Sequence, residues 1–389
     1  MNLLYVIYRE NIFSPLVKGQ VLDILFKNKS NIKIHLLWIK RIDYYFKNTN
    51  EIKSIKKALK QNNIILHEIP LITGRFPLNE KRTAFNDMQI KQKIRRIIKN
   101  NKIDIVHTRG YNAGLIVAKI KKMGIHFKHV FDPRSPYLTE LQSTYNISEK
   151  SKEYIFWKEN EKFIINNSDK VIAISKDFQK YLNCIKENTV YIPNNSNINN
   201  IDQIKMLSKT NRRKSICYVG SMGNGWNNIN TYFDFMEKVY KFDKEIVFEL
   251  YVLQSSYSSV YERSSKSIIP AENFIVKSLK PDEVNTTIAG SLAGMQIMEM
   301  KDSRLGIKTV DYLSSGVPII CNNNAMGASN LVKEEKIGWN IDEDKDLSKL
   351  VKTIESIDMS EKCIDFSYKN FSTDKVAEKY LETYKNLLN

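Results

Sequence analysis

The sequence is poor in cysteine and histidine, the residues that most often build disulfides and metal sites. It has four cysteines and five histidines in 389 residues. The cysteines do not occur in a C-x-x-C or other metal-like spacing, and neither do His35, His67, His126 and His129. We therefore expect a reduced protein without a disulfide framework, and no catalytic metal.

Long apolar runs are also absent. No run approaches the roughly 20 apolar residues that a membrane-spanning helix needs, and residues 1–10 lack the basic leader of a signal peptide. The hydrophobic share of 42% and the charged share of 26% are typical of a soluble globular protein, and the length suits two domains. We expect a cytoplasmic protein that is soluble, or peripheral at the inner face of the plasma membrane.

Acidic residues are scarce in the first half of the chain. Residues 1–200 contain 35 Lys and Arg but only 17 Asp and Glu, a net charge of +18, whereas residues 201–389 carry a net charge of −1. A biased genome composition would enrich both halves alike, so the asymmetry favours a function, such as contact with anionic lipid, nucleic acid or a polyanionic acceptor. The excess clusters at Lys53, Lys56, Lys57 and Lys60, at Lys91, Lys93, Arg95, Arg96 and Lys99, and at Lys119, Lys121 and Lys122.

Strand-like and helix-like segments alternate along the chain. Short apolar runs typical of buried parallel strands occur at Asn2–Tyr8, Ile32–Ile39, Ile64–Ile69, Ile103–Thr108, His129–Asp132, Lys170–Ile174, Val190–Pro193, Ile216–Val219, Phe248–Leu253, Asn273–Ser278, Met295–Met298 and Val317–Cys321. Helical periodicity occurs between many of them, notably at Leu16–Phe26, Ile90–Lys99, Ala113–Met123, Lys150–Asn167 and Phe371–Leu388. The pattern predicts an α/β protein with two Rossmann-like, doubly wound domains that face each other across a cleft.

A polar stretch, residues 194–213, interrupts the alternation. We therefore expect a first domain over residues 1–197, a linker over 198–212, a second domain over 213–370 and a C-terminal helix over 371–389.

Residues 308–322 indicate a short helix, ended by Gly316 and Pro318, that leads directly into a buried strand. Lys308 and Asp311 are three residues apart and share one face of its first turn. That turn also presents unpaired backbone N–H groups and the positive end of the helix dipole, where an anion is favoured. A cation, free amides and a carboxylate can together hold a phosphate and a sugar hydroxyl, so the segment predicts a nucleotide-sugar site. The alternatives are a solvated lysine and a carboxylate that caps the first turn.

Six segments resemble, in order, those of a known family. They are Asp104–Tyr111, Val130–Pro136, Trp157 and Glu161 followed by Ser168–Ser175, Ile192–Asn194, Tyr218–Gly223, and Lys308–Ile320. They are similar to segments of the retaining glycosyltransferases of GT-B fold, in the large group 1 family that includes capsule, O-antigen and exopolysaccharide enzymes. The resemblance covers nearly the whole chain.

Three positions depart from the pattern of this family. Where the wider family has a Glu-x7-Glu pair, this chain has Ser303 and Asp311, and Asn195 stands where glycine is usual after Ile192–Asn194. Many members of the subgroup lack the first glutamate. Asp311 shortens the second carboxylate by one methylene, which changes its reach to a ribose hydroxyl.

The resemblance implies a donor site in the second domain and a C-terminal helix that crosses back onto the first. The donor would be a nucleotide sugar, UDP- or GDP-linked, and no cofactor or metal would be needed. Lys308 would be the catalytic cation at the diphosphate, and Asp311 would hold ribose hydroxyls. Arg304 is a second candidate catalytic cation that could equally face solvent. The other predicted donor-binding residues are Gly220, Ser221, Gly223, Gly306 and Thr309.

In the first domain, His107 and Arg109 end a strand where doubly wound sheets bind their ligands. We predict that His107 is catalytic and orients the donor sugar or the acceptor, although a structural histidine bonded to a neighbouring carbonyl is an equal alternative. Arg134 follows Asp132 at the equivalent place on the next strand, where the two could instead form an internal ion pair. Arg109, Arg134 and Ser14 make up the expected acceptor side.

The predicted function is therefore hexosyl-type transfer, with retention, to a lipid-linked glycan acceptor in bacterial surface polysaccharide (capsule, O-antigen or lipopolysaccharide) synthesis. The basic first domain would contact an anionic membrane surface. Alternatives are a sugar-nucleotide 2-epimerase of related fold, which should carry more carboxylates and histidines, a catalytically silent partner subunit, or a basic nucleic-acid-binding protein. The last should interleave aromatic residues with its charge or show a recognised module; neither is evident, so we expect no nucleic-acid partner.

Overall fold

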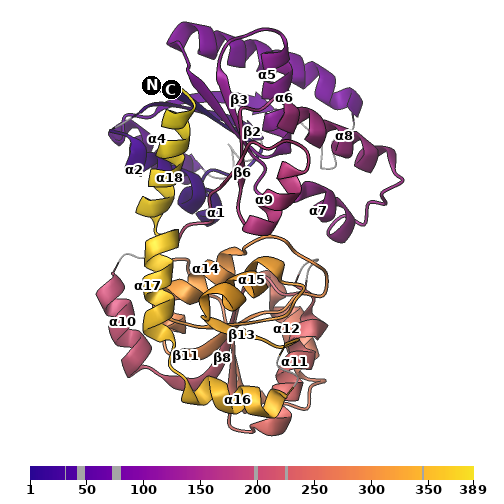
Figure 1. Cartoon of the computed structure of the whole chain (residues 1–389), viewed down its shortest axis with the longest axis vertical. Helices are drawn as coiled ribbons and strands as arrows, with labels where there is room; N and C mark the ends of the chain where they lie inside the picture. The colour runs from indigo at the N-terminus through magenta and orange to yellow at the C-terminus, as the bar shows by residue number, and fades with distance from the viewer. Residues whose placement is uncertain (31, 42–48, 72–79, 197–199, 224–226, 344–345) are drawn as a thin grey trace. The chain divides into compact units, whose positions relative to one another are not determined.

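The computed structural model describes residues 1–30, 32–41, 49–71, 80–196, 200–223, 227–343 and 346–389 (Figure 1). The chain divides into two compact units. Unit 1 comprises residues 1–142, 147–192 and 376–389, and unit 2 comprises residues 143–146 and 193–375.

Unit 1 is built on a sheet whose seven described strands all pair in parallel, in the order β3-β2-β1-β4-β5-β6-β7. The central strands are nearly continuous apolar runs because helices cover both faces of the sheet; in β1, every residue from Leu3 to Tyr8 is buried. The strands are β1 (Asn2–Tyr8), β2 (Lys33–Arg41), β3 (Ile65–Leu71), β4 (Ile105–Arg109), β5 (Lys128–Asp132), β6 (Lys170–Ala173) and β7 (Thr189–Tyr191).

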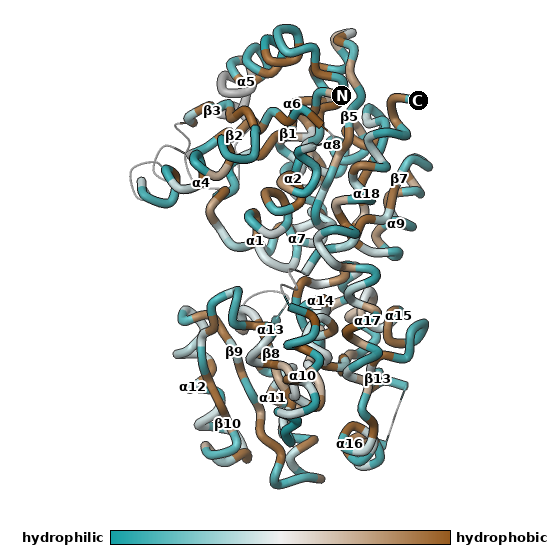
Figure 2. The backbone as a smooth tube through the Cα atoms, turned by 90° about the vertical axis from the view of Figure 1, so that its left-hand side faces the viewer, coloured by the Kyte–Doolittle hydropathy of each residue, from teal (hydrophilic) through white to brown (hydrophobic). Residues whose placement is uncertain are grey.

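The helices of unit 1 pack their apolar faces on this sheet, and their tubes alternate between hydrophobic and hydrophilic colours in Figure 2. Serine side chains cap several of them; Ser14, Ser151 and Ser175, for example, each accept a backbone N–H of the first turn. The helices are α1 (Pro15–Val17), the π-helical turn η1 (Lys18–Leu22), α2 (Asp23–Asn28), α4 (Thr49–Gln61), α5 (Glu80–Asn101), α6 (Tyr111–Lys122), α7 (Tyr137–Ser143), α8 (Lys152–Asn166), α9 (Lys176–Asn183) and α18 (Thr373–Asn386).

Unit 2 has a second parallel sheet, with its described strands in the order β10-β9-β8-β11-β12-β13. They are β8 (Arg213–Gly220), β9 (Val247–Val252), β10 (Phe274–Lys277), β11 (Ser291–Gln296), β12 (Ile319–Cys321) and β13 (Gly338–Asn340). The α-helices are α10 (Ile201–Thr210), α11 (Ile229–Phe242), α12 (Tyr257–Ser264), α13 (Val284–Ile288), α14 (Ile307–Ser314), α15 (Met326–Glu335), α16 (Leu347–Ser356) and α17 (Ser360–Phe371), with short 3-10 turns η2 (Gln254–Ser256) and η3 (Ala271–Asn273).

Strand order in both sheets reverses direction beside the first strand, which makes them doubly wound. The chain runs outward from β1 to β3 and returns to β4, and in unit 2 it runs from β8 to β10 and returns to β11. Ligands of such sheets bind at the carboxyl ends of the strands flanking this switch point. The predicted fold class, two Rossmann-like α/β units, is confirmed.

The C-terminal helix α18 packs on unit 1, as predicted. Its residues Val376, Tyr380 and Tyr384 are buried in the same hydrophobic cluster as Leu3 and Tyr5 of β1. The Asn28 side chain on α2 donates a hydrogen bond of 3.0 Å to the carbonyl of Ala377, and Figure 1 shows the helix, in yellow, beside α2.

Two segments differ from the sequence-based expectation. Residues 201–210, within the predicted linker, form helix α10 in unit 2, with Ile204 buried and Lys205 paired to Asp365 on α17 at 2.7 Å. Strand β13 was not predicted, because its three residues are too few to show a period.

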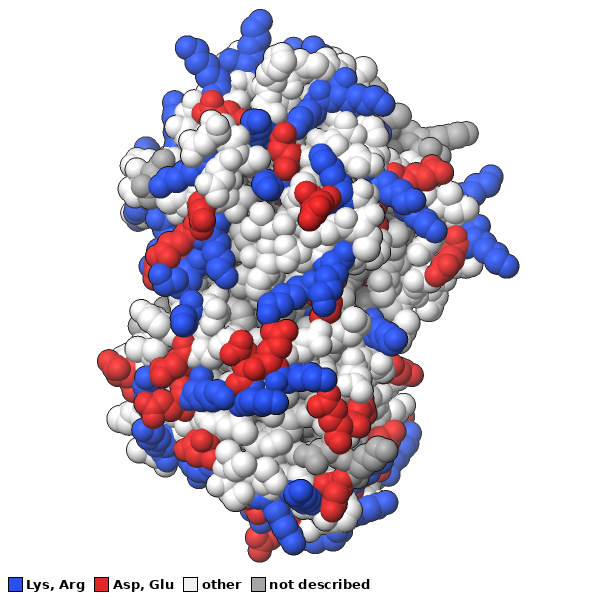
Figure 3. Space-filling model, in the orientation of Figure 1, with Lys and Arg blue, Asp and Glu red and all other residues white. Residues whose placement is uncertain are grey.

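The charge asymmetry is visible on the face of the molecule in Figure 3, where blue side chains dominate unit 1 and both colours mix on unit 2. Some of the clustered lysines are paired: Lys56 with Glu68, and Lys121 with Asp169. Among the described residues, no helix is both long enough and apolar enough to span a bilayer.

Candidate functional site

The carboxyl end of β8 turns sharply at two glycines. Gly220 and Gly223 have φ angles of +126° and +100°, values that side chains with a Cβ rarely adopt. The Tyr218 hydroxyl stabilises this turn by donating a hydrogen bond to the carbonyl of Ser221. The backbone of Gly220 and Ser221 therefore lies at the switch point, and Gly220 itself places no side chain over it.

Helix α14 begins on the neighbouring side of the same switch point. Its N-cap is Gly306, which offers no side-chain cap, and the carbonyl of Gly306 accepts from the N–H groups of both Thr309 and Val310. Within the described part of the chain, no partner is found for the N–H groups of Ile307 and Lys308. The first turn holds no carboxylate, so its positive end is not neutralised.

Tyr312 fixes α14 against the sheet. Its hydroxyl accepts from the N–H of Val219 and donates to the carbonyl of Met295, each at 3.1 Å. Its ring lies flat on β11 at Gly294, where an added Cβ would come within 2.5 Å of the ring. The orientation of the first turn is therefore set by packing, not by its own charged residues.

Lys308 is turned toward β8. Its Nζ donates to the hydroxyl of Tyr218 at 3.0 Å and to Oδ1 of Asn227 at 2.6 Å, and it lies 4.4 Å from the centre of the Tyr218 ring. Its Cε would be 3.8 Å from a Cβ at Gly220. The predicted residues Lys308 and Gly220 are thus brought together. Burial lowers the pKa of the Lys308 ammonium to about 7, although Asp302 opposes this.

Asp311 lies three residues after Lys308 on α14, and its carboxylate accepts no hydrogen bond from any described residue. It forms no ion pair with Lys308 in this part of the structure, although the two are three residues apart. Burial raises its pKa to about 7. A cation and a carboxylate that could neutralise each other are therefore each left available to a ligand.

Arg304 is neither free nor fully exposed. Its guanidinium makes a two-pronged ion pair with Asp302, with Nε to Oδ1 and Nη2 to Oδ2 both at 2.9 Å. Two further polar atoms face Gly306: Oε1 of Gln296 and Oγ1 of Thr309 are buried without a hydrogen-bond partner among the described residues. The sequence predicted Thr309 but not Gln296.

The predicted position of His107, at the end of its strand, is wrong. β4 ends at Arg109, and His107 lies inside the strand with none of its surface exposed. Its Nδ1 is 2.7 Å from the Tyr384 hydroxyl, and its ring stacks on Tyr5. Burial lowers its pKa. The structural alternative holds, with a tyrosine of α18 as the partner instead of a carbonyl, and His107 has no surface that a substrate could touch.

Of the expected acceptor-side residues in unit 1, Arg109 ends β4, Arg134 follows β5 and Ser14 precedes α1. Arg109 donates through Nε to both oxygens of Glu10 and through Nη2 to Gln20, while its Nη1 is buried without a partner among the described residues. Ser14 caps α1.

Arg134 has a left-handed φ of +65° and pairs with Asp132 at 3.3 Å, so the internal ion pair that the sequence left open is present. Although burial opposes the shift, Arg134 and His107 lower the pKa of Asp132 to about 2.

Sequence reasoning missed the residues that hold Lys308. Tyr218 lies in a predicted strand and in one of the segments that resemble the family. Its contact with Lys308, which is 90 residues away in the sequence, leaves no local signal. Asn227 and Glu10 were missed for the same reason. No cluster of three or more potential metal ligands occurs among the described residues.

Comparison with known proteins gives a family match for one segment of the chain and structural matches for its whole fold. A sequence model described as Glycosyltransferase Family 4 matches residues 55–195. The whole chain is similar to the structure of HepE from Anabaena in complex with UDP and glucose, at 14% identity and a TM-score of 0.66, over 99% of this chain and 100% of that one.

Two other structures are similar over the full chain. The lipopolysaccharide outer core galactosyltransferase WaaB has 14% identity and a TM-score of 0.71, with 100% of both chains covered. A glycosyltransferase from Rickettsia africae has 16% identity and a TM-score of 0.69, over 100% of this chain and 98% of that one. No curated protein sequence matches. These likenesses, with the two doubly wound sheets, define the fold as GT-B.

The pKa of Asp311 leads to a stability prediction. Between pH 3.8 and about 7, Asp311 keeps a proton in the folded protein that the unfolded chain has lost. The contribution of this protonated group to the free energy of unfolding is therefore full below pH 3.8 and is lost as the pH rises through about 7. We expect Asp311→Asn to abolish this decline and raise the free energy of unfolding at pH 8 by about 1–3 kcal/mol, given about 1.4 kcal/mol per pKa unit and partial screening by solvent. Urea unfolding between pH 4 and 8 measures this.

The matched control is Asp282→Asn, an exposed carboxylate of unit 2, which should leave the pH profile unchanged. An Asp311→Asn protein with the wild-type profile would show that the carboxylate is solvated and has its ordinary pKa.

Proposed function

We propose that this chain is a retaining glycosyltransferase that takes its sugar from a nucleotide-sugar donor held in unit 2. The observation that carries the proposal is the pair Lys308 and Asp311 on one turn of α14, each without an oppositely charged partner among the described residues, beside the glycine turn of β8. A nucleoside diphosphate sugar supplies what both lack: an anion for the lysine and hydroxyl donors for the carboxylate.

In this proposal the diphosphate lies at the start of α14. The free N–H groups of Ile307 and Lys308, the helix dipole and the Lys308 ammonium stabilise the negative charge that grows as the bond between the sugar C1 and the phosphate oxygen breaks. The acceptor hydroxyl forms the new bond to C1 on the same face, and its proton passes to the leaving diphosphate. This same-face exchange retains the configuration and needs no protein base.

Other groups of unit 2 have supporting roles. Asp311 accepts hydrogen bonds from the ribose hydroxyls, and the backbone of Gly220 and Ser221 approaches the phosphates. Arg304 stays on Asp302 and contributes charge at longer range. Because HepE was crystallised with UDP and glucose, we take UDP as the first nucleotide to test, and GDP as the second. The reaction is proposed to need no metal.

The acceptor is proposed to be a lipid-linked glycan of bacterial surface polysaccharide synthesis. Its support is the net charge of +18 on residues 1–200, which suits an enzyme that works at an anionic membrane surface. Arg109 and Arg134 remain the proposed acceptor-side cations.

A donor screen tests the enzyme proposal. UDP-, GDP- and dTDP-sugars are incubated with wild type, Lys308→Ala and the control Lys352→Ala, an exposed helix lysine, and nucleotide release is measured with and without a chelator. We expect wild type and control to hydrolyse one donor class with or without the chelator, and Lys308→Ala to lose about 10²–10³-fold in kcat/KM, the usual effect of removing one preorganised donor.

The screen also separates the alternatives. Conversion of the donor to its 2-epimer without net transfer would identify an epimerase, and no binding of any sugar nucleotide would reject the enzyme proposal. Turnover that stops when a chelator is added would contradict the proposal that no metal is needed, but not the proposed transferase activity.

The membrane proposal predicts salt-dependent binding to vesicles. Wild type should co-sediment with anionic phosphatidylserine vesicles at low ionic strength and dissociate at high salt, because each surface lysine contributes about 1 kcal/mol that salt screens. Replacing Lys53, Lys57 and Lys60 of α4 by glutamine should lower the bound fraction at least about tenfold. The same change at Lys238, Lys241 and Lys244 in unit 2 should not. Equal losses for both triple variants, or salt-independent binding, would contradict the proposal.

A further inference from the structure

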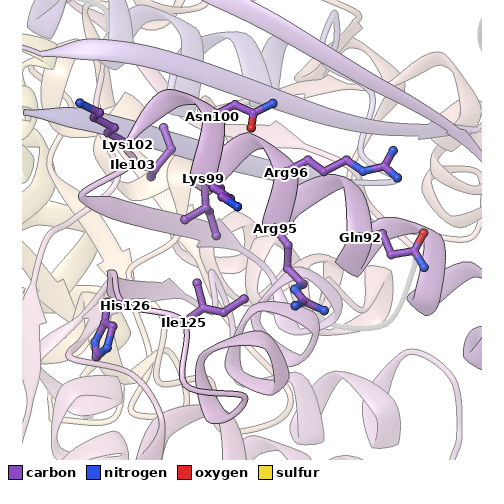
Figure 4. A pocket seen from close by; sticks show the side chains of 10 residues that line it. Gln92, Arg95, Arg96, Lys99, Asn100, Lys102, Ile103, Ile125 and His126 are labelled. Carbon is purple, nitrogen blue, oxygen red and sulfur yellow. The ribbon is translucent and has the colours of Figure 1, made fainter.

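A hollow lies in unit 1, away from the residues at the carboxyl ends of its strands. It has a volume of about 630 Å³, within the usual range for small-molecule sites. It is lined by the last turns of α5 and by the segments that precede β4 and β5. Its lining residues are Gln92, Arg95, Arg96, Ile98, Lys99, Asn100, Lys102, Ile103, Ile125 and His126 (Figure 4).

The hollow is at the amino edge of the sheet, because Ile103 comes just before β4 and His126 just before β5. Arg109 and Arg134 lie at the other ends of the same two strands. Five strand residues at about 3.3 Å each separate the two edges by roughly 17 Å. One small ligand therefore cannot occupy both places, and the hollow is not part of the acceptor side described above.

The lining carries more positive charge than the dipole of helix α5 explains. Four Lys and Arg side chains line it and no carboxylate does. A basic residue at a helix C-terminus is favoured by the helix dipole, but only Lys99 is in the last turn of α5. Arg95 and Lys99 are four residues apart, on one face of α5, where two like charges repel. Within the described residues, none of the four lining cations forms an ion pair.

The chemistry of the lining suits an anion. Figure 4 shows Arg95 extending from α5 on the side of Ile125, while Arg96 extends in a different direction. Arginine matches the oxygens of a phosphate group with two parallel hydrogen bonds. The lining has no Phe, Tyr or Trp on which a nucleobase could stack, and it includes the buried Ile98 and Ile103.

We propose that this hollow, lined by Arg95, Lys99 and His126, is a binding site for a phosphorylated anion, separate from the donor site. The phosphate group can belong to a free phosphorylated metabolite or to the headgroup of a phosphomonoester lipid. The proposal does not depend on the enzyme activity, since binding at this site is measured without any donor.

The test is calorimetric titration with inorganic pyrophosphate of wild type, Arg95→Gln/Lys99→Gln, Lys53→Gln/Lys57→Gln and Lys308→Ala. The second double variant is the matched control, since Lys53 and Lys57 are also exposed, four residues apart, on a helix of unit 1. We expect the Arg95/Lys99 variant to lose at least tenfold in one binding event that the control and Lys308→Ala both keep. Circular dichroism and thermal unfolding verify that each variant is folded.

Three results would overturn the proposal: no binding to wild type at millimolar pyrophosphate, equal binding to the Arg95/Lys99 variant, or loss of all binding in Lys308→Ala, which would place the anion in unit 2. A second arm uses phosphatidylcholine vesicles with and without phosphatidic acid. Loss of phosphatidic acid binding in the Arg95/Lys99 variant identifies a lipid headgroup as the source, and loss of pyrophosphate binding alone identifies a free anion. Both outcomes support the site.

Discussion

The separation of Lys308 from Asp311 is the constraint on which the candidate site depends. Opposite charges three residues apart on a helix usually attract each other, with a gain of about 0.2–0.5 kcal/mol. Here Lys308 turns to Tyr218 and Asn227 instead. Burial then brings the pKa values of both groups to about 7, from opposite directions. Both groups thus lie where burial disfavours their charged forms.

The scaffold around α14 explains how this state persists. Tyr312 holds the helix to β8 and β11 through two backbone hydrogen bonds, and Gly294 leaves room for its ring. The charged groups at the carboxyl edge of unit 1 are different, because Arg109 already has Glu10 and Gln20, and Arg134 already has Asp132. This contrast is why we propose the donor site in unit 2 from specific contacts, whereas we propose the acceptor side from charge alone.

Sequence reasoning succeeded where a physical signal is local. Asn2–Tyr8 is an unbroken apolar run, and β1 has the same bounds. The Lys308–Asp311 spacing and the family resemblance predicted a helix start that the structure contains as α14. Both domains followed from the alternation of strands and helices.

The failures concern contacts between distant residues. Residues 201–210 are polar and resemble a linker, but α10 is stabilised through Lys205 and Asp365, which no local pattern reveals. His107 was placed at a strand end because the apolar run stops near it. Its burial depends on Tyr384, 277 residues later. Tyr218 and Asn227 were not predicted because they are 90 and 81 residues from Lys308 in the sequence.

The central claim is that Lys308 is the cation that receives the diphosphate, and proton uptake on nucleotide binding tests it most directly. At pH 8 a lysine with a pKa of about 7 is mostly neutral, and a bound diphosphate raises that pKa. Calorimetric titration of UDP at pH 8, in two buffers of different ionisation enthalpy, measures the protons taken up. We predict an uptake approaching one proton in wild type and none in Lys308→Met. Binding without uptake, or with the same uptake in Lys308→Met, would contradict the account.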